Sequence, residues 1–196
     1  IEQPIPFIYE RIGEKYNNYL IDEFQDTSTL QWQNLLPLLE NSLAYNNRNL
    51  IVGDAKQAIY RWRGGDVDQF ALLPEAPQFA DNEIIQERIQ TLKRQFNPKN
   101  LDSNYRSTKE TIQFNNLFFK ELLSQLPDFF ETYYAEYQQK VGTKKTGGYA
   151  QIKLFKKEDY IDNSLDEILK VIRDNDARGR NRSEICVLSR RNADLA

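Results

Sequence analysis

The stretch YLIDEFQDT, residues 19–27, decides the fold that this sequence predicts. Residues 19–21 are a short continuous apolar run, which is typical of a buried parallel strand covered on both faces. Asp22 and Glu23 follow at once, so the strand would carry two carboxylates to the carboxyl edge of a sheet, where open α/β folds bind ligands. Such a pair suits magnesium binding and water activation in nucleotide hydrolysis. A strand that runs into a solvated acidic turn is the alternative for these residues alone.

A second strand of the same kind is predicted over residues 50–52, where Leu-Ile-Val is closed by Gly53 and Asp54. Residues 29–41 between the two strands have helix-face spacing of leucines, and Pro37 is expected to kink or break that helix. Two such strands joined by a helix make a right-handed βαβ unit. The fold class is therefore α/β with a parallel sheet.

The rest of the sequence predicts further helices and a second βαβ unit. Residues 67–97 indicate helix interrupted by Pro74 and Pro77, and residues 98–100 mark a domain boundary. The remaining expectations are a helix from about Ser107 onward, a polar linker or hairpin over 138–148, strands over 151–155 and 185–188, and a helix over 164–173.

Composition limits the function classes. The 196 residues are 40% hydrophobic and 28% charged with a net charge of -3, which is ordinary for a globular protein. There is no His, so histidine catalysis and histidine metal sites are excluded, and the single Cys186 excludes a disulfide scaffold and fits the cytoplasm. No apolar run approaches the ~20 residues of a membrane span. Met is absent even at position 1, so we expect an excerpt of a longer chain or a processed product.

Three stretches together resemble the UvrD-like superfamily 1 DNA helicases. Residues 20–27 resemble the Walker B stretch, helicase motif II; residues 52–64 resemble motif III; and residues 104–108, Asn-Tyr-Arg-Ser-Thr, resemble motif IV. Their order matches, and residues 185–192 resemble the stretch that follows motif IV. Phe24 and the Gly-Asp-Ala-Lys-Gln run at 53–57 are more similar to the RecB/AddA helicase–nuclease branch than to UvrD and Rep proper.

The resemblance implies a partial RecA-like sheet of the P-loop NTPase type with flanking helices. Residues 1–97 would be the end of the first motor domain, with motifs II and III. Residues 98–196 would be the start of a truncated second motor domain, with motif IV.

The resemblance also implies an ATP site between those domains. Asp22 would hold Mg²⁺, Glu23 would be the catalytic base, and Gln57 would sense the γ-phosphate. Arg106 would act as an arginine finger, and Tyr105 would stack near the nucleotide base. The alternatives are an ordinary polar residue for Gln57, a surface ion pair for Arg106 and a core position for Tyr105.

Single-stranded DNA contact is implied for the aromatic and basic part of motif III. Tyr60 and Trp62 would stack on bases, while Arg61 and Arg63 would contact backbone phosphates. The alternative is that Trp62 packs in the core and both arginines are solvated. The lysines over 140–157 fit a solvated loop better than a nucleic-acid site, because acidic residues follow them directly.

The phosphate-cradling G-x-x-x-x-G-K-[ST] pattern does not occur in this sequence, and neither do motifs V and VI. We therefore expect these 196 residues alone to hydrolyse no ATP. The whole protein is expected to be an ATP-dependent helicase of exodeoxyribonuclease V type, acting on single-stranded and duplex DNA in repair or recombination. An attached nuclease domain or a partner subunit would complete it. Two alternatives stay open: a non-catalytic helicase-like domain that binds DNA or a partner, and a nuclease with metal on Asp22, Glu23 and Asp54.

Overall fold

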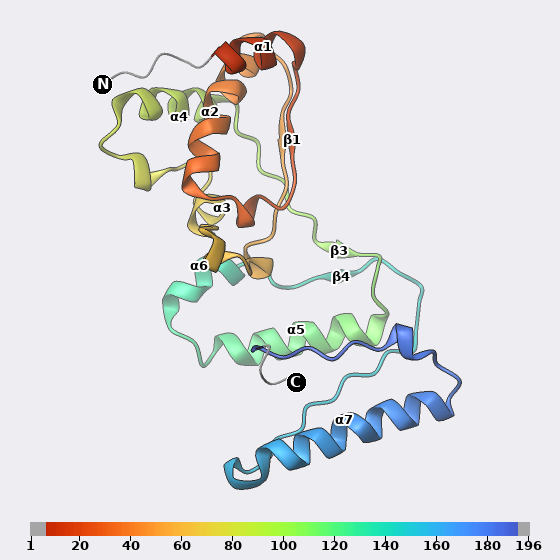
Figure 1. Ribbon diagram of the computed structural model, residues 1–196. Helices are drawn as coiled ribbons and strands as arrows, with labels where there is room; N and C mark the ends of the chain where they lie inside the picture. Colours follow the sequence, from red (N-terminus) through yellow and green to blue (C-terminus); the bar gives the residue numbers. More distant parts are fainter. Residues whose placement is uncertain (1–6, 192–196) are drawn as a thin grey trace. The chain divides into compact units, whose positions relative to one another are not determined.

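The computed structural model describes residues 7–191 (Figure 1). These form two compact units, residues 7–149 and residues 150–191. The domain boundary predicted at 97/98 lies inside the first unit and stays a prediction. In chain order the first unit contains α1 (Phe7–Lys15), β1 (Leu20–Ile21), α2 (Thr29–Ala44), β2 (Leu50–Ile51), α3 (Asp68–Ala71), α4 (Glu83–Gln95), β3 (Ser103–Asn104), α5 (Lys109–Leu123), α6 (Glu131–Tyr134) and β4 (Lys140–Val141). Single 3-10 turns lie at Phe24–Asp26, Ala55–Gln57, Arg61–Arg63, Pro77–Phe79 and Asp128–Phe130.

The first βαβ unit is confirmed. Strands β1 and β2 pair in parallel with Leu20 opposite Leu50 and Ile21 opposite Ile51, and α2 connects them. The expected burial on both faces is wrong. Ile21 and Ile51 pack against the core, but Leu20 is 76% exposed, because only one face of this two-stranded sheet is covered in the described chain.

Helix α2 is well capped at its start and is not broken by its proline. The Ser28 hydroxyl accepts a hydrogen bond from the Gln31 N–H, and the Gln31 side chain accepts one from the Ser28 N–H, which is a capping box. Pro37 lies inside the helix, which continues to Ala44. The expected break is therefore wrong, since α2 packs against α1 and α4, which hold the helix across the missing N–H donor. A kink at Pro37 stays a prediction.

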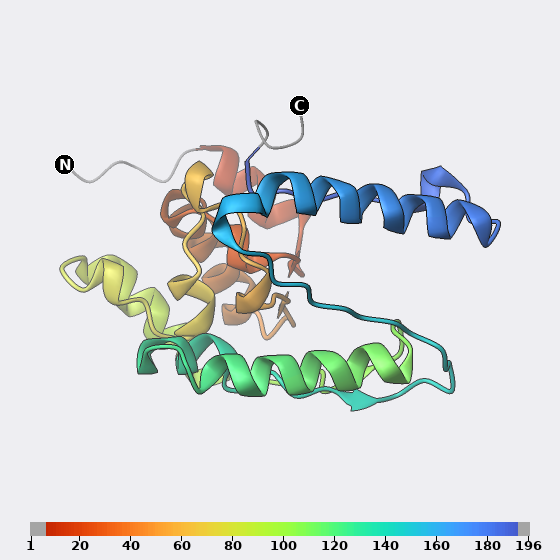
Figure 2. The ribbon, with the colours of Figure 1, turned by 90° about the horizontal axis from the view of Figure 1, so that it is seen from below.

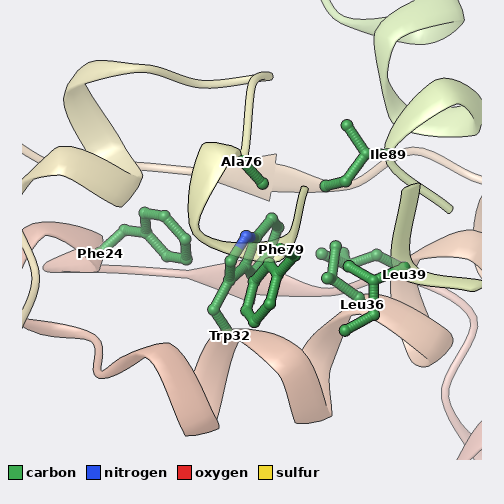
Figure 3. Close-up of a cluster of buried hydrophobic side chains, with 8 residues drawn as sticks. Phe24, Trp32, Leu36, Leu39, Ala76, Phe79 and Ile89 are labelled. Atoms are coloured by element: carbon green, nitrogen blue, oxygen red, sulfur yellow. The ribbon is translucent and has the colours of Figure 1, made fainter. Parts of the chain in front are cut away.

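The core of the first unit lies between α2, α4 and the covered face of the β1–β2 sheet. Trp32, Leu36 and Leu39 follow one helical face of α2, and Ile85 and Ile89 do the same on α4. Figure 3 shows Trp32 between Phe24 and the two leucines. The Phe24 and Trp32 rings meet edge to face at 4.8 Å between centroids. This contact pins the residue that follows the Asp22-Glu23 pair to the core.

A second parallel strand pair lies where the sequence did not predict one. Strand β3 pairs with β4 through Ser103 opposite Lys140 and Asn104 opposite Val141, with α5 between them in sequence. Figures 1 and 2 both show β4 running alongside α5. The predicted linker over 138–148 therefore contributes a strand. The carboxyl end of β3 leads directly into Tyr105 and Arg106.

The second unit contains one long helix, α7 (Tyr160–Ala177), with 3-10 turns at Lys157–Asp159 and Arg182–Glu184. The helix predicted over 164–173 is confirmed inside α7. The strands predicted over 151–155 and 185–188 are wrong, because these segments pair with no neighbouring strand in the described part of the chain. Leu154 and Leu188 are accordingly exposed. Asn192, the last residue of the stretch that resembles the one after motif IV, lies outside the described residues.

Truncating Leu36 to alanine should destabilise the first unit by about 2–5 kcal/mol, since its side chain is fully buried and the cavity would not refill. Urea unfolding of the chain measures this. Leu30→Ala, on the same helix but 66% exposed, is the control and should change stability by less than about 0.5 kcal/mol. Equal losses in the two variants would contradict the packing described for α2.

The contact between α6 and α3 should make stability fall at alkaline pH. The Tyr133 hydroxyl donates a hydrogen bond to the Asp68 carboxylate, and this bond, with burial and the charges of Asp68 and Asp66, raises the pKa of Tyr133 from 10.0 to about 12. Only the neutral phenol can donate this hydrogen bond. The stabilisation is therefore complete below the unfolded-state pKa of Tyr133 and is lost as pH rises through its folded-state pKa.

In urea unfolding between pH 9 and pH 12, wild type should therefore lose more stability than Tyr133→Phe over the window bounded by those pKa values. Tyr149→Phe, which alters an exposed tyrosine, is the control and should follow wild type. Parallel curves for wild type and Tyr133→Phe would contradict the contact.

Candidate functional site

The acidic turn after β1, residues 22–27, carries two exposed carboxylates, and its backbone has an unusual conformation. Asp22 and Glu23 are both solvent-exposed, and Glu23 has left-handed backbone angles, φ 51° and ψ 41°. The Glu23 N–H donates to the Asp22 carboxylate at 2.9 Å, and the next N–H, of Phe24, donates to the Val52 carbonyl at 3.0 Å. A non-glycine residue holds this conformation only where its surroundings impose it. Here it is imposed by the buried Phe24 ring and by the hydrogen bond from the Phe24 N–H to the Val52 carbonyl.

One buried side chain connects the turn to the loop after β2. Gln25, only 1% exposed, donates from Nε2 to the Glu23 carboxylate at 2.6 Å and accepts from the Asp54 N–H at 3.0 Å through Oε1. A Cβ on Gly53 would lie 2.7 Å from that Gln25 oxygen, so the glycine provides the space. Nothing in the residue pattern alone assigns a role to Gln25 or to Gly53, because their partners lie 28 or 29 positions away in sequence.

The loop after β2 is organised around Asp54. Its carboxylate accepts from the Lys56 N–H at 3.1 Å and from the Gln57 amide at 2.9 Å, and it pairs with Lys56 Nζ at 2.7 Å. Partial burial raises the pKa of Asp54, but the hydrogen bonds from Lys56 and Gln57 and the charge of Lys56 together hold it below its usual value. Asp54 is therefore ionised at neutral pH and already has three contacts, with Lys56 and Gln57.

Gln57 keeps hydrogen-bonding capacity for a ligand. Its side chain is exposed and uses one of its two N–H donors on Asp54. The second donor and the carbonyl oxygen have no partner within residues 7–191. A neutral amide with one free donor and one free acceptor can bind either a phosphate oxygen or a water.

The aromatic and basic loop is attached to the acidic turn at several points. The Ile59 N–H donates to the Asp26 carboxylate at 3.3 Å, the Asp66 N–H donates to the Thr27 carbonyl at 3.1 Å, and Ser28 forms an antiparallel bridge with Gly65. The buried Gln69 donates to the same Thr27 carbonyl at 2.9 Å. Movement of the acidic turn would therefore displace this loop.

The loop presents its side chains to solvent. Trp62 is 73% exposed, so the alternative that it packs in the core is wrong. The Arg63 guanidinium carbon lies 4.6 Å from the Trp62 ring centroid and 5.7 Å from that of Tyr60, within the range of cation–π attraction. Arg61 is also exposed. Two aromatic faces and two cations thus share one short surface loop.

The motif IV residues follow β3 in the same manner as the acidic turn follows β1. The Asn104 carboxamide oxygen accepts from the Arg106 and Ser107 N–H groups at 3.0 and 2.9 Å, which turns the chain at the strand end. Tyr105 is 70% exposed, with its ring against Gly142, so a core position for it is wrong. Arg106 is exposed and forms no ion pair within residues 7–191, and no hydrogen bond or ion pair joins either side chain to the acidic turn there.

The donor set at the turn fits Mg²⁺ bound with a nucleotide. Magnesium is usually held by one or two carboxylates together with phosphates and water, and Asp22 offers an exposed carboxylate. Residues 7–191 contain no group of three or more His, Cys, Asp or Glu side chains placed to hold a metal by themselves. A surface pocket of about 480 Å³ borders Glu23 and leaves room for a ligand; it is lined by Tyr9, Glu23, Asp26, Thr27, Gln31, Asn34, Leu35 and Leu38.

Comparison with known proteins agrees with this geometry. Residues 5–78, which hold the acidic turn, the Asp54 loop and the aromatic loop, match the family UvrD/REP helicase N-terminal domain. The resemblance to UvrD-like helicases is confirmed. This UvrD-like segment ends before α4, so motif IV lies outside the family match.

Curated relatives of this chain carry helicase–nuclease names. RecBCD enzyme subunit RecB of Mycobacterium tuberculosis is 39% identical over 61 residues, 31% of this chain and 5% of the relative. Exonuclease/helicase subunit RexA of Lactococcus lactis is 32% identical over 123 residues, 61% of this chain and 9% of the relative. RecBCD enzyme subunit RecB of Chlamydia pneumoniae is 28% identical over 161 residues, which is 81% of this chain and 14% of the relative. The chain thus spans a small part of these relatives, whose names agree with the RecB/AddA branch.

None of the helices in residues 7–191 is both long enough and apolar enough to cross a membrane.

Proposed function

We propose that this chain is part of an ATP-dependent DNA helicase, in which Mg-ATP hydrolysis drives movement along single-stranded DNA. The observation that carries the proposal is the bonded connection between the acidic turn and the Asp54 loop. Gln25 and Asp54 connect Glu23 to Gln57 through successive hydrogen bonds. In the proposed mechanism Glu23 would act on the attacking water and Gln57 on the γ-phosphate. The UvrD/REP family match over these residues supports it.

Within that site each side chain has a distinct task. Asp22 would hold the magnesium ion, which would supply positive charge to neutralise the phosphates. The Glu23 carboxylate would orient and deprotonate the attacking water, and the free groups of Gln57 would bind the γ-phosphate. The phosphate-cradling loop, absent from these residues, would come from another part of the parent protein.

Arg106 and Tyr105 would complete the site from a second RecA-like domain. Both follow a parallel strand and are exposed, and Arg106 has no competing carboxylate among the described residues. In the nucleotide-bound state Arg106 would reach the transferring phosphoryl group and stabilise its charge, while Tyr105 would stack near the base. The assignment of residues 1–97 and 98–196 to successive motor domains belongs to this proposal.

The DNA would contact the loop that carries Tyr60, Arg61, Trp62 and Arg63. Exposed aromatics stack on bases of any sequence, and arginines neutralise phosphates. The bonds from Asp26 and Ser28 to this loop give a physical connection between nucleotide state and grip on the strand. Change at the γ-phosphate would be transmitted through a few hydrogen bonds rather than across the whole domain.

The helicase–nuclease branch is the more specific part of the proposal. It rests on the names of the relatives and on the Lys56 and Phe24 positions. It implies action at duplex DNA in repair or recombination, a cytoplasmic location, and completion by an attached nuclease domain or a partner subunit. A nuclease site on Asp22, Glu23 and Asp54 is disfavoured because the Asp54 carboxylate is already bonded to the Lys56 ammonium, the Lys56 N–H and the Gln57 amide.

Replacing Glu23 with glutamine in the parent protein should reduce kcat for ATP hydrolysis by on the order of 10²- to 10⁴-fold, because the amide cannot accept the proton of water. Binding of a fluorescent ATP analogue should remain near the wild-type level. Steady-state ATPase assays with single-stranded DNA and equilibrium binding measure the two effects. Undiminished turnover would remove Glu23 from the mechanism, and a wild-type parent without ATPase would favour a non-catalytic binding protein.

Trp62→Ala should weaken binding of a fluorescein-labelled oligothymidine to the chain. Loss of one stacked base, about 1–3 kcal/mol, corresponds to a Kd increase of roughly 5- to 150-fold in an anisotropy titration at low salt. Tyr45→Ala removes a comparably exposed aromatic, 74% against 73%, outside the loop and serves as the control. The loop is not the DNA contact if both variants bind as wild type does.

A further inference from the structure

Gln25 is the one residue of the acidic turn that is polar and fully buried. Its side chain is 1% exposed, whereas Asp22 and Glu23 beside it are exposed. Both ends of its amide are bonded, Nε2 to Glu23 and Oε1 to the Asp54 N–H. The orientation of the amide is fixed by chemistry, because an ionised carboxylate can only accept and a backbone N–H can only donate.

No other side chain of this length can make both contacts without binding an additional proton. A glutamate at position 25 could still accept from Asp54 but would set a second carboxylate against Glu23. A methionine would fill the space and leave the buried Asp54 N–H without an acceptor. Gly53 and the Phe70 ring shape the space for the amide, since a Cβ on Gly53 would lie 2.7 Å from Gln25 Oε1 and 3.0 Å from that ring.

The contact with Glu23 restricts a side chain that would otherwise be mobile. An exposed glutamate has three rotatable side-chain torsions, and fixing such a side chain costs conformational entropy. The charge-assisted bond from Gln25, 2.6 Å long, holds one carboxylate oxygen in place before any ligand arrives. The other carboxylate oxygen stays available to water.

The contact with Asp54 carries the same restraint to Gln57. Gln25 holds the Asp54 main chain, and the Asp54 carboxylate holds the Gln57 amide at 2.9 Å. Glu23 and Gln57 come from loops after different strands. Their relative position therefore depends on this single buried amide as well as on the strand pairing.

We propose that Gln25 is a positioning residue, which sets the Glu23 carboxylate relative to Gln57 for attack of water on the γ-phosphate. This rests on the proposed function, in which Glu23 and Gln57 perform those roles. Gln25 itself touches neither water nor nucleotide in this assignment. Misplacement of a reacting group by about 1 Å is enough to lower a rate by on the order of 100-fold.

Gln25→Met in the parent protein should lower kcat for DNA-stimulated ATP hydrolysis by on the order of 10- to 100-fold and leave KM for ATP near its wild-type value. Gln25→Glu keeps the acceptor for Asp54 and can hold Glu23 only by sharing a proton with it, so its kcat should fall relative to wild type as the pH rises. Wild-type kcat in Gln25→Met, or in Gln25→Glu at alkaline pH, would overturn the proposal.

The control is Ser42→Ala, which removes a similarly buried polar group, 2% exposed, bonded to the Asn17 carbonyl and to Asn49 Oδ1 away from both loops of the site. It should lower the urea midpoint about as much as Gln25→Met does but retain kcat. A fall in kcat that follows the loss of stability equally in both variants would reduce Gln25 to a structural role and overturn the proposal.

A second measurement does not depend on ATPase activity. In NMR spectra of the 196-residue chain, the Gln25 side-chain amide should exchange slowly with solvent, and Gln25→Met should shift the Asp54 backbone amide and the Gln57 side-chain amide. Exchange as fast as that of an exposed glutamine would overturn the proposal. A protected Gln25 amide together with a wild-type parent that hydrolyses no ATP would support the contact, while overturning the proposed function and the catalytic consequence drawn from it.

Discussion

The hydrogen bond from the Phe24 N–H to the Val52 carbonyl is the constraint on which the rest of the site depends. It extends the parallel β1–β2 pairing past the strand ends, and the buried Phe24 ring against Trp32 prevents the turn from swinging away. With that residue fixed on both sides, Glu23 is held in a left-handed conformation that it would not adopt freely. The exposed carboxylates are thus placed by a buried aromatic ring.

The acidic turn and the loop after β2 are also bonded together so closely that they behave as one structure. Main-chain groups from 54, 59 and 66 bond to residues 25, 26 and 27, so three successive positions of one turn hold three separate points of the other loop. The chemistry of the first loop and the exposed aromatics of the second are therefore mechanically connected. Among the described residues, the Arg106 side chain has no such connection.

Much of the site was predictable from the sequence because its parts are local. The apolar run before Asp22, the Gly-Asp pair after residue 52 and the Asn-Tyr-Arg stretch each lie within a few residues, and their exposure follows from the strand ends that precede them. The strands at 151–155 and 185–188 were not predictable in the same way. An apolar run forms a strand only when another strand is available to pair with it. In the described chain the second parallel pair forms between residues 103–104 and 140–141 instead.

The sequence by itself determined the chemistry of this protein: which carboxylates, amides, aromatics and cations are available, and in which order. Only the tertiary structure decided that Gln25 and Gly53 belong to the site, that Trp62 and Tyr105 face solvent, and that one face of the first sheet is uncovered. The physical reason is distance along the chain. A side chain bonded to a partner almost thirty residues away leaves no periodic signal in either segment, and its role becomes visible only when parallel pairing brings the two turns together.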